Sequence, residues 1–182
     1  PHTFDLNVSK REPLVPRQLR AEVPERIAAD GSVLKPLDRE ALRAAIDRLL
    51  AEKVESIAIC FLHAYTSPAH EETAAALVRE RWPDGHVAVS SEVLPEFREY
   101  ERLSSTVINA YLMPATRDYF HQFARNIAAL GIAEAPFVMN SGGGVITPAV
   151  AAKRPLDTLF SGPSGGVSGA VYVAERAGYP NI

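Results

Sequence analysis

The fold of this chain is decided by the stretch Ser56-Ile57-Ala58-Ile59-Cys60-Phe61-Leu62. After its first serine the stretch is apolar throughout, which is typical of a strand that is buried on both faces of a sheet. It is also the longest apolar run of the chain, and it is far shorter than the roughly 18 residues that a membrane span needs. The stretch therefore predicts a buried strand over 56–62.

Helical patterns flank this strand on both sides. Before it, Asp38 can cap a first turn, and an apolar stripe follows at helical spacing, formed by Leu42, Ala45, Ile46, Leu49 and Leu50. After it, Ser67-Pro68 predicts a helix start, with serine as the cap, and Trp82 lies near the predicted end. Val87–Val89 is the next predicted strand. Helix, strand, helix and strand in this order predict an α/β fold with parallel strands and helical crossovers.

The first 36 residues predict extended segments and turns, because they are rich in proline. Leu19, Ala21 and Val23 alternate with polar neighbours, which is the pattern of a half-buried strand. Asp30-Gly31 is a predicted turn after that strand.

The second half predicts a long helical region over 97–130, broken in two by Pro114 and ended by Gly131. A strand over 136–139 then leads into Ser141-Gly142-Gly143-Gly144, and Thr147-Pro148 starts a short helix. A strand over 158–160 leads into a second glycine-rich loop, 161–166, and a last helix follows over 167–177.

Composition narrows the class of protein. The formal net charge of −3 over 182 residues argues against a nucleic-acid or anionic-membrane partner, which would need a basic face. No secretory signal is recognisable at the N-terminus, and Cys60 is the single cysteine, so we expect a cytoplasmic protein without an internal disulfide. Cys60 lies within the apolar stretch, so we expect an inert thiol. The first residue is Pro1 rather than methionine, and we expect that the chain was cut or trimmed.

Two glycine-rich stretches are the first candidates for a ligand site. Each follows a predicted strand and precedes a predicted helix, where backbone amides favour anions and glycine allows close approach. The residues concerned are Ser141, Gly142, Gly143, Gly144, Ser161, Gly162, Ser164, Gly165 and Gly166. A tight turn without a ligand explains each stretch equally well. Neither stretch has the Gly-Lys-Ser/Thr ending of a phosphate-binding P-loop.

His63 is a further candidate, because it directly follows the predicted buried strand, at the sheet edge where α/β proteins bind ligands. A metal site would need His63, His70 and Glu71 or Glu72 to converge, and the alternative is a histidine that orders its loop by hydrogen bonding. We predict no metal ligand here. The charged segment Glu92–Arg102 indicates either an exposed helix start or an electrostatic clamp between lobes.

Several stretches taken together resemble the hydantoinase A and 5-oxoprolinase family, which includes acetone carboxylase subunits. They are Pro13–Arg17 with Val23–Ile27, Phe61–Tyr65 with Pro68–Glu71, Ser91–Arg102, Asn109–Pro114 and Ser161–Val167. Five ordered regions of similarity are more specific than any single glycine-rich loop. Ser164 and Gly142 depart from the residues that are common in the family, which leaves the choice of substrate open.

This resemblance implies partial lobes of the actin, Hsp70 and sugar-kinase type (ribonuclease H-like), which clasp ATP and Mg²⁺. It also implies that residues 1–95 are the rear part of an N-terminal lobe. Residues 96–182 would be connecting helices and the start of a second lobe. The two Asp-x-Gly-Gly-Thr phosphate loops of the family do not occur in this sequence. We therefore expect an internal fragment that is inactive alone and binds no cofactor alone.

The function that the resemblance implies is ATP-dependent opening of a small cyclic amide, of the hydantoin or 5-oxoproline type, together with a hydantoinase B-type partner subunit or domain. One alternative is a subunit of an ATP-dependent ketone carboxylase of the acetone type. Another is a catalytically silent lobe with an assembly or regulatory role. The glycine-rich stretches and His63 are then the candidates for the cleft that binds nucleotide or substrate.

Overall fold

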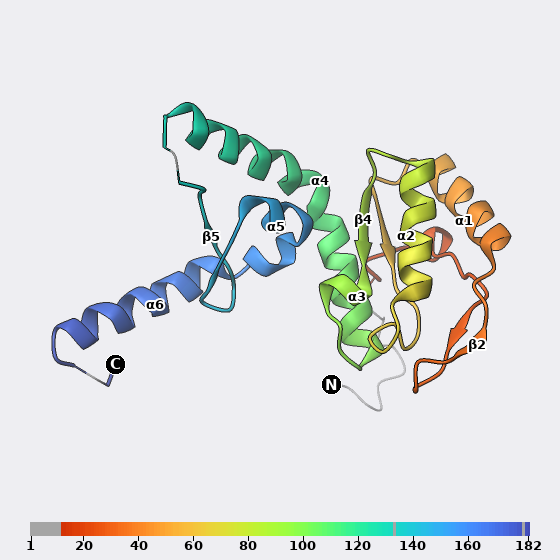
Figure 1. The fold of residues 1–182 in the computed structure, drawn as a ribbon, viewed down its shortest axis with the longest axis horizontal. Helices are drawn as coiled ribbons and strands as arrows, with labels where there is room; N and C mark the ends of the chain where they lie inside the picture. The colour runs from red at the N-terminus through yellow and green to blue at the C-terminus, as the bar shows by residue number, and fades with distance from the viewer. Residues whose placement is uncertain (1–11, 133, 180) are drawn as a thin grey trace.

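The computed structural model describes residues 12–132, 134–179 and 181–182. It shows mixed helix and sheet in an elongated arrangement (Figure 1), in which a long helix, α4, joins two groups of elements. Helices α1 and α2 pack with strands β3 and β4 in the first group. The hairpin β5–β6 and helices α5 and α6 form the second group.

The first group confirms the predicted α/β unit. Strands β3 (Ser56–Ile59) and β4 (His86–Val89) pair in parallel, with Ile57 opposite Val87, and α2 (Ala69–Arg81) is the crossover between them. Helix α1 (Arg39–Ala51) begins at Asp38 as predicted, because the Asp38 carboxylate accepts hydrogen bonds from two first-turn amides. The core that these elements share includes Leu42, Ile46, Ile57, Ile59, Ala74, Val78, Val87 and Val89.

Two details of this unit differ from the prediction. Strand β3 ends at Ile59 rather than at residue 62, since the Phe61 amide donates to the Glu71 carboxylate at 2.7 Å, and its carbonyl accepts from Arg102 at 2.8 Å. The backbone amide and carbonyl of Phe61 are therefore bound to side chains and not to a neighbouring strand. The prediction that Ser67 caps α2 is also wrong, because α2 begins after Pro68 and no side chain caps it.

The N-terminal part has less strand than predicted. Leu19, Ala21 and Val23 do alternate with exposed neighbours, but residues 17–19 form a 3₁₀ turn and no strand follows in 19–23. The nearby carbonyls of Gln18 and Arg20 instead accept hydrogen bonds from the Arg48 guanidinium, both at 2.9 Å. The first strands are β1 (Arg26–Ile27) and β2 (Val33–Lys35), which are antiparallel. The predicted turn at Asp30-Gly31 between them is confirmed.

After the short helix α3 (Ser90–Val93), α4 runs from Glu99 to Ala129 without a break, so the predicted break at Pro114 is wrong. A proline inside a helix removes one hydrogen bond and bends the axis, and Figure 1 shows α4 changing direction near its middle. Packing holds both halves: Met113 lies in a cluster with Ala88 of β4, and Phe120 lies in another with α5. Gly131 follows the helix end with a φ of 75°, as predicted.

The second group starts with a hairpin that the sequence did not predict. Strands β5 (Val138–Met139) and β6 (Val145–Ile146) are antiparallel, so the first glycine-rich stretch leads into a strand and not into a helix. Helix α5 (Pro148–Lys153) begins at the predicted cap Thr147. The strand expected over 158–160 is wrong, because η2 (Pro155–Thr158) is a 3₁₀ turn. Helix α6 (Ser161–Arg176) follows and ends before Gly178.

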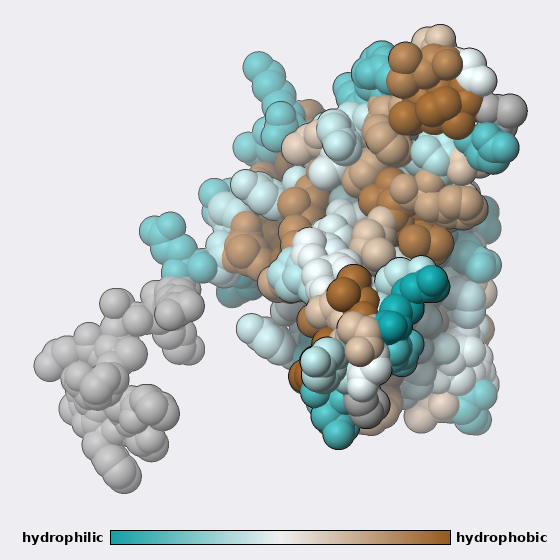
Figure 2. Space-filling model, turned by 90° about the vertical axis from the view of Figure 1, so that its left-hand side faces the viewer, coloured by the Kyte–Doolittle hydropathy of each residue, from teal (hydrophilic) through white to brown (hydrophobic). Residues whose placement is uncertain are grey.

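The surface of the second group carries many apolar side chains. Figure 2 views this side of the molecule and shows apolar residues spread among polar ones. On α6 the exposed apolar residues are Val167, Val171, Tyr172 and Val173, and Ala174 is its one buried residue. None of the helices in the described part of the chain is long and apolar enough to span a membrane.

His86, the first residue of β4, makes the free energy of unfolding depend on pH. The Nδ1 atom of His86 is buried and finds no hydrogen-bond partner among the described residues. Burial lowers the pKa of His86 below 6.5, Arg117 lowers it further, and Asp118 and Glu55 raise it. The unfolded chain then binds a proton more readily than the folded chain, so stability falls as the pH drops from about 6.5 towards the folded-state pKa.

We expect His86→Gln to flatten this dependence, and His121→Gln to leave it unchanged, because His121 is exposed. Urea unfolding at pH 5 to 7.5 measures the free energy of unfolding for each variant. Equal pH profiles for the parent chain and His86→Gln would contradict the assignment.

Candidate functional site

The two glycine-rich stretches lie next to each other in the folded chain. Ser141–Gly144 forms the turn of the β5–β6 hairpin, and 161–166 forms the first turns of α6. Together they border an open pocket of about 430 Å³, whose lining residues are Ser141, Gly142, Gly143, Phe160, Pro163, Ser164, Val167 and Ser168. Four of the predicted site residues, Ser141, Gly142, Gly143 and Ser164, therefore line this pocket. Four others, Ser161, Gly162, Gly165 and Gly166, belong to the helix that forms one of its walls.

The backbone amides of the hairpin turn form hydrogen bonds within the turn itself. The Asn140 side-chain oxygen accepts hydrogen bonds from the amides of Gly142 at 2.9 Å and Gly144 at 3.0 Å, and its main-chain oxygen accepts from Gly143 at 3.3 Å. Gly143 has a φ of 86°, which glycine adopts most readily. The turn is thus closed on itself, and Gly142 and Gly143 offer the pocket backbone surface rather than free amide donors.

Ser141 connects this turn to the start of α6. Its amide and its hydroxyl both donate to the main-chain oxygen of Asp157, at 2.6 and 2.8 Å. The same hydroxyl oxygen accepts a hydrogen bond from the Phe160 amide at 3.0 Å. Ser141 therefore fixes the distance between the hairpin turn and Phe160, the residue just before α6.

The second stretch is helical and not the predicted loop, because α6 already begins at Ser161. No side chain caps this helix. Among the described residues, the amides of Ser161 and Gly162 have no hydrogen-bond acceptor. Free amides at a helix start carry partial positive charge and favour an anion. The start of α6, next to the pocket, is therefore the part of the site that can bind a negatively charged group.

The glycines of α6 face different surroundings. A Cβ on Gly165 would lie 3.6 Å from the Met139 side chain, at van der Waals contact, so this side of α6 packs on β5. A Cβ on Gly162 or Gly166 would have no atom within 4 Å. The space beside Gly162 and Gly166 is open to solvent or to a ligand, whereas Gly165 has a packing role.

His63 lies at a separate place. It has a φ of 58°, its Nδ1 atom lies 2.8 Å from the Ile27 main-chain oxygen, and its ring meets the edge of Tyr65 at 6.1 Å between centroids. It is not among the residues that line the pocket. In this structure His63 orders the loop after β3 and ties it to β1.

His70 and Glu71 do not converge with His63. The Nδ1 atom of His70 lies 2.8 Å from the Glu25 carboxylate, and Glu71 points into the protein interior. Over residues 12–132, 134–179 and 181–182, no group of three or more His, Cys, Asp or Glu side chains is placed to hold a metal ion. We assign no metal ligand to this chain.

A buried polar network that the sequence did not reveal joins α2 to α4. Glu71 and Arg102 are both fully buried. The Glu71 carboxylate accepts from the Ser90 hydroxyl at 2.6 Å, from the Ser91 amide at 2.8 Å and from the Phe61 amide at 2.7 Å. Arg102 donates to the Phe61 main-chain oxygen at 2.8 Å and to the Ser90 hydroxyl at 3.3 Å. The two opposite charges thus hold the backbone amide and the backbone carbonyl of one residue, Phe61, between them.

Helical spacing is the sequence signal that could have found Glu71. It precedes the buried residues Ala74, Ala75 and Val78 of the same helix by three, four and seven positions, so it belongs to their buried stripe. Arg102 likewise shares a helical face with the buried residues Thr106, Asn109 and Met113 of α4, which follow it by four, seven and eleven positions. A charged residue on an apolar stripe is the pattern that indicates a buried, paired charge.

Cys60 is partly buried next to this network. Burial raises the pKa of its thiol, and a hydrogen bond with Ser90 lowers it to a smaller extent. The raised pKa keeps the thiol protonated near neutral pH, which agrees with the predicted inert cysteine.

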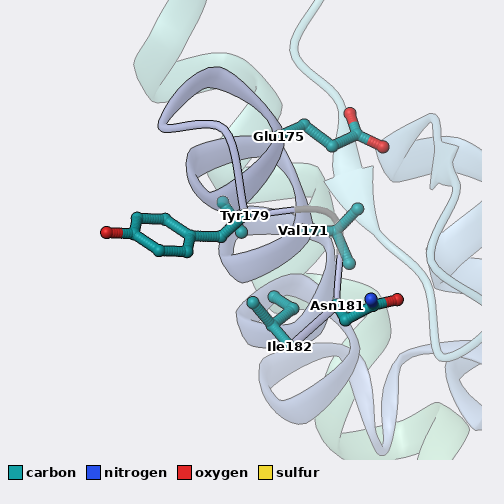
Figure 3. Close-up of a pocket in the computed structure, with 6 residues that line it drawn as sticks. Val171, Glu175, Tyr179, Asn181 and Ile182 are labelled. Atoms are coloured by element: carbon teal, nitrogen blue, oxygen red, sulfur yellow. The ribbon is translucent and has the colours of Figure 1, made fainter.

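A second open pocket, of about 480 Å³, lies between the last turns of α6 and the residues Tyr179, Asn181 and Ile182 (Figure 3). Its lining residues are Val171, Ala174, Glu175, Tyr179, Asn181 and Ile182. The Tyr179 ring points away from the other labelled side chains in this view. None of the predicted site residues lines this pocket, and we assign it no ligand.

Comparisons with known proteins identify relatives along the whole chain. Residues 1–82 match the hydantoinase/oxoprolinase N-terminal region, and residues 102–182 match the hydantoinase/oxoprolinase domain. The caprolactamase subunit alpha of Pseudomonas jessenii is 36% identical over 181 residues, which cover 100% of this chain and 26% of that protein. The 5-oxoprolinase of Saccharomyces cerevisiae is 34% identical over 137 residues, covering 75% of this chain and 10% of that protein.

Solved structures agree with these matches. The crystal structure of the ATP-dependent caprolactamase from Pseudomonas jessenii superposes with a TM-score of 0.84 over 98% of this chain and 26% of that one. Nucleotide-free acetone carboxylase is 32% identical, with a TM-score of 0.82 over 92% of this chain and 24% of that one. The chain thus spans about a quarter of the length of these relatives. It belongs to the hydantoinase/oxoprolinase family.

Proposed function

We propose that the whole protein containing these residues is an ATP-dependent hydrolase that opens cyclic amides of the hydantoin or 5-oxoproline type. Two relatives, the caprolactamase and the 5-oxoprolinase, support this class of substrate by their names. Within this chain the proposal is carried by one observation: the amides of Ser161 and Gly162 at the start of α6 lie between Phe160 and Pro163, which line a pocket that both glycine-rich stretches border.

The residues of the pocket fit an anionic group better than a metal ion. Free amides at a helix start suit a phosphate or a carboxylate, whereas the described residues hold no carboxylate cluster for Mg²⁺. ATP, when bound to the whole protein, would supply a phosphoryl group that makes a stable amide oxygen easier to displace. The role that we assign to this chain is to bind and orient the negatively charged part of the nucleotide or substrate at Ser161, Gly162 and Ser164.

The larger architecture belongs to the same proposal. We infer two lobes of the actin, Hsp70 and sugar-kinase type, with residues 1–95 in the first lobe, and with residues 96–182 providing the connection and the start of the second. The place of α4 between the two groups of elements supports this division (Figure 1). His63 stays a candidate for the substrate-facing side of the first lobe, since it follows β3 in an ordered loop.

An ATP-dependent ketone carboxylase is the second candidate function. Acetone carboxylase superposes almost as well as the caprolactamase, with TM-scores of 0.82 and 0.84. Relatives of both kinds are named as subunits, for example caprolactamase subunit alpha and the acetophenone carboxylase gamma subunit of Aromatoleum aromaticum. We therefore propose a partner subunit of the hydantoinase B type for this protein too, and a cytoplasmic location for the complex.

The test is a substrate panel with the whole protein and its partner subunit. Each reaction contains ATP and Mg²⁺ and either a cyclic amide (hydantoin, 5-oxoproline or caprolactam) or acetone with bicarbonate. We expect ADP formation that depends on a cyclic amide. ADP formation only with ketone and bicarbonate would favour the carboxylase, and no ATP turnover with any substrate would refute both enzymes and favour a silent lobe.

A further inference from the structure

The buried face of α4 carries three fully buried polar residues, Arg102, Thr106 and Asn109. Arg102 reaches the first group of elements through Phe61 and Ser90. The Thr106 hydroxyl donates only within its own helix, to the Arg102 main-chain oxygen at 2.7 Å. Asn109 differs from both, because its side chain reaches the second group of elements.

The Asn109 amide spans the turn between α5 and η2. Its nitrogen donates to the Lys153 main-chain oxygen at 3.1 Å, and its oxygen accepts from the Leu156 amide at 3.2 Å. The first bond satisfies a carbonyl at the end of α5, and the second satisfies an amide in η2. One side chain thus sets the conformation of residues 153–156.

This turn is connected to the pocket by a short series of hydrogen bonds. The main-chain oxygen of Asp157, directly after the turn, accepts both bonds from Ser141, and Ser141 accepts from the Phe160 amide. Arg154 supports the same turn: its guanidinium lies 3.0 Å from the Asp157 carboxylate and donates to the Val93 main-chain oxygen at 3.3 Å. The start of α6 and the hairpin turn therefore both depend on where residues 153–157 lie.

Apart from the packing of Gly165 on Met139 of β5, the first turn of α6 has no buried side chain that could hold it in place. Ala174, its one buried residue, lies near the opposite end. We propose that Asn109 is a positioning residue, which fixes the α5–η2 turn and, through Asp157 and Ser141, the place of the free amides of Ser161 and Gly162. The consequence for turnover rests on the proposed function, whereas the effect on the α6 start does not.

The experiment compares Asn109→Leu, Asn109→Asp and Thr106→Val in the whole protein with its partner subunit. Thr106 is the matched control, since it is equally buried on the same helix and its hydroxyl donates within α4 rather than to α5 or η2. Leucine removes both hydrogen bonds of Asn109, and aspartate keeps the acceptor that serves the Leu156 amide. The readouts are hydrogen–deuterium exchange in peptides covering 153–164, followed by mass spectrometry, and steady-state ATP kinetics.

We expect exchange in 153–164 to be about tenfold faster in Asn109→Leu, less affected in Asn109→Asp, and unchanged in Thr106→Val. In a turnover assay, the KM for ATP should rise with the same ranking. Equal exchange in Asn109→Leu and Thr106→Val would overturn the positioning role. If Asn109→Leu fails to fold, the comparison of Asn109→Asp with Thr106→Val decides the question in the same way. If the variants differ in exchange as expected but the parent protein turns over no ATP, the positioning role is supported and the proposed function is refuted.

Discussion

Replacing Arg102 by methionine will lower the free energy of unfolding by about 3–5 kcal/mol, the usual cost of removing one partner from a buried charge network. Arg102 is fully buried, and its loss leaves the Phe61 carbonyl unpaired and removes the positive charge nearest the Glu71 network. Methionine keeps much of the side-chain volume, so the change reports mainly on charge and hydrogen bonding. The midpoint of urea unfolding measures it.

Arg98→Met is the matched control for this change. Arg98 lies one turn before Arg102, but its side chain is 66% exposed, and its ion pair with Glu101 is long, at 3.8 Å. Exposed pairs of this kind contribute little, so we expect a change of less than about 0.5 kcal/mol. Similar losses for Arg98→Met and Arg102→Met would show that the buried network is not what stabilises the α2–α4 junction.

Filling the pocket beside α6 will reduce ATP-dependent turnover of the whole protein by about 100-fold, since small displacements of a bound reactant have effects of this size. The variant is Val167→Trp. Val167 lines the pocket and is 66% exposed, so a larger side chain has room without disturbing a core. Steady-state assays with the preferred cyclic amide measure the effect, and the thermal midpoint checks that the protein remains folded.

Val173→Trp is the control for this variant. Val173 belongs to the same helix, is 65% exposed, and lines neither of the two pockets. We expect turnover within about twofold of the parent protein, because the change is distant from the bound reactant. Full activity in a folded Val167→Trp protein would mean that the pocket is not part of the reaction site. Gly165→Val would be a poorer probe, because Gly165 faces Met139 and its replacement disturbs packing.

The sequence predicts the α1–β3–α2–β4 unit well, because local periodicity and burial agree there. The apolar stripe from Leu42 to Leu50 and the run from Ile57 to Ile59 pack on each other as their spacing indicates. The caps Asp38 and Thr147 are also local signals, since each side chain bonds to amides two or three residues away. Such features need no knowledge of the rest of the fold.

The errors lie where distant contacts decide the structure. Pro114 does not end α4, because packing against β4 on one side and α5 on the other holds both halves of the helix. Glycine-rich residues 161–166 resemble a loop, yet they are helical, with Ser141 of a distant hairpin bonded to the amide of Phe160 just before them. Propensity is a weak guide when a long-range hydrogen bond sets where a helix begins.

At the candidate site, too, long-range contacts escape prediction from the sequence. Four of the residues that the sequence suggests, Ser141, Gly142, Gly143 and Ser164, line the pocket, whereas His63 lies elsewhere, and the sequence does not indicate what each residue does. Ser141 bonds to Asp157 and Phe160, and Gly142 donates to Asn140, so both shape the site from within the chain. Glu71 and Arg102 remained undetected as a pair because they are 31 positions apart (102 − 71 = 31) and meet only through Ser90 and Phe61.

The most direct test of the account is the stoichiometry of ring opening by the whole protein with its partner subunit. ADP and ring-opened product are quantified together, by coupled assay and chromatography, with and without ATP. We predict equal amounts of ADP and ring-opened product, and no ring opening when ATP is omitted. Ring opening that proceeds equally well without ATP, or ADP formation without any opened ring, would contradict the account.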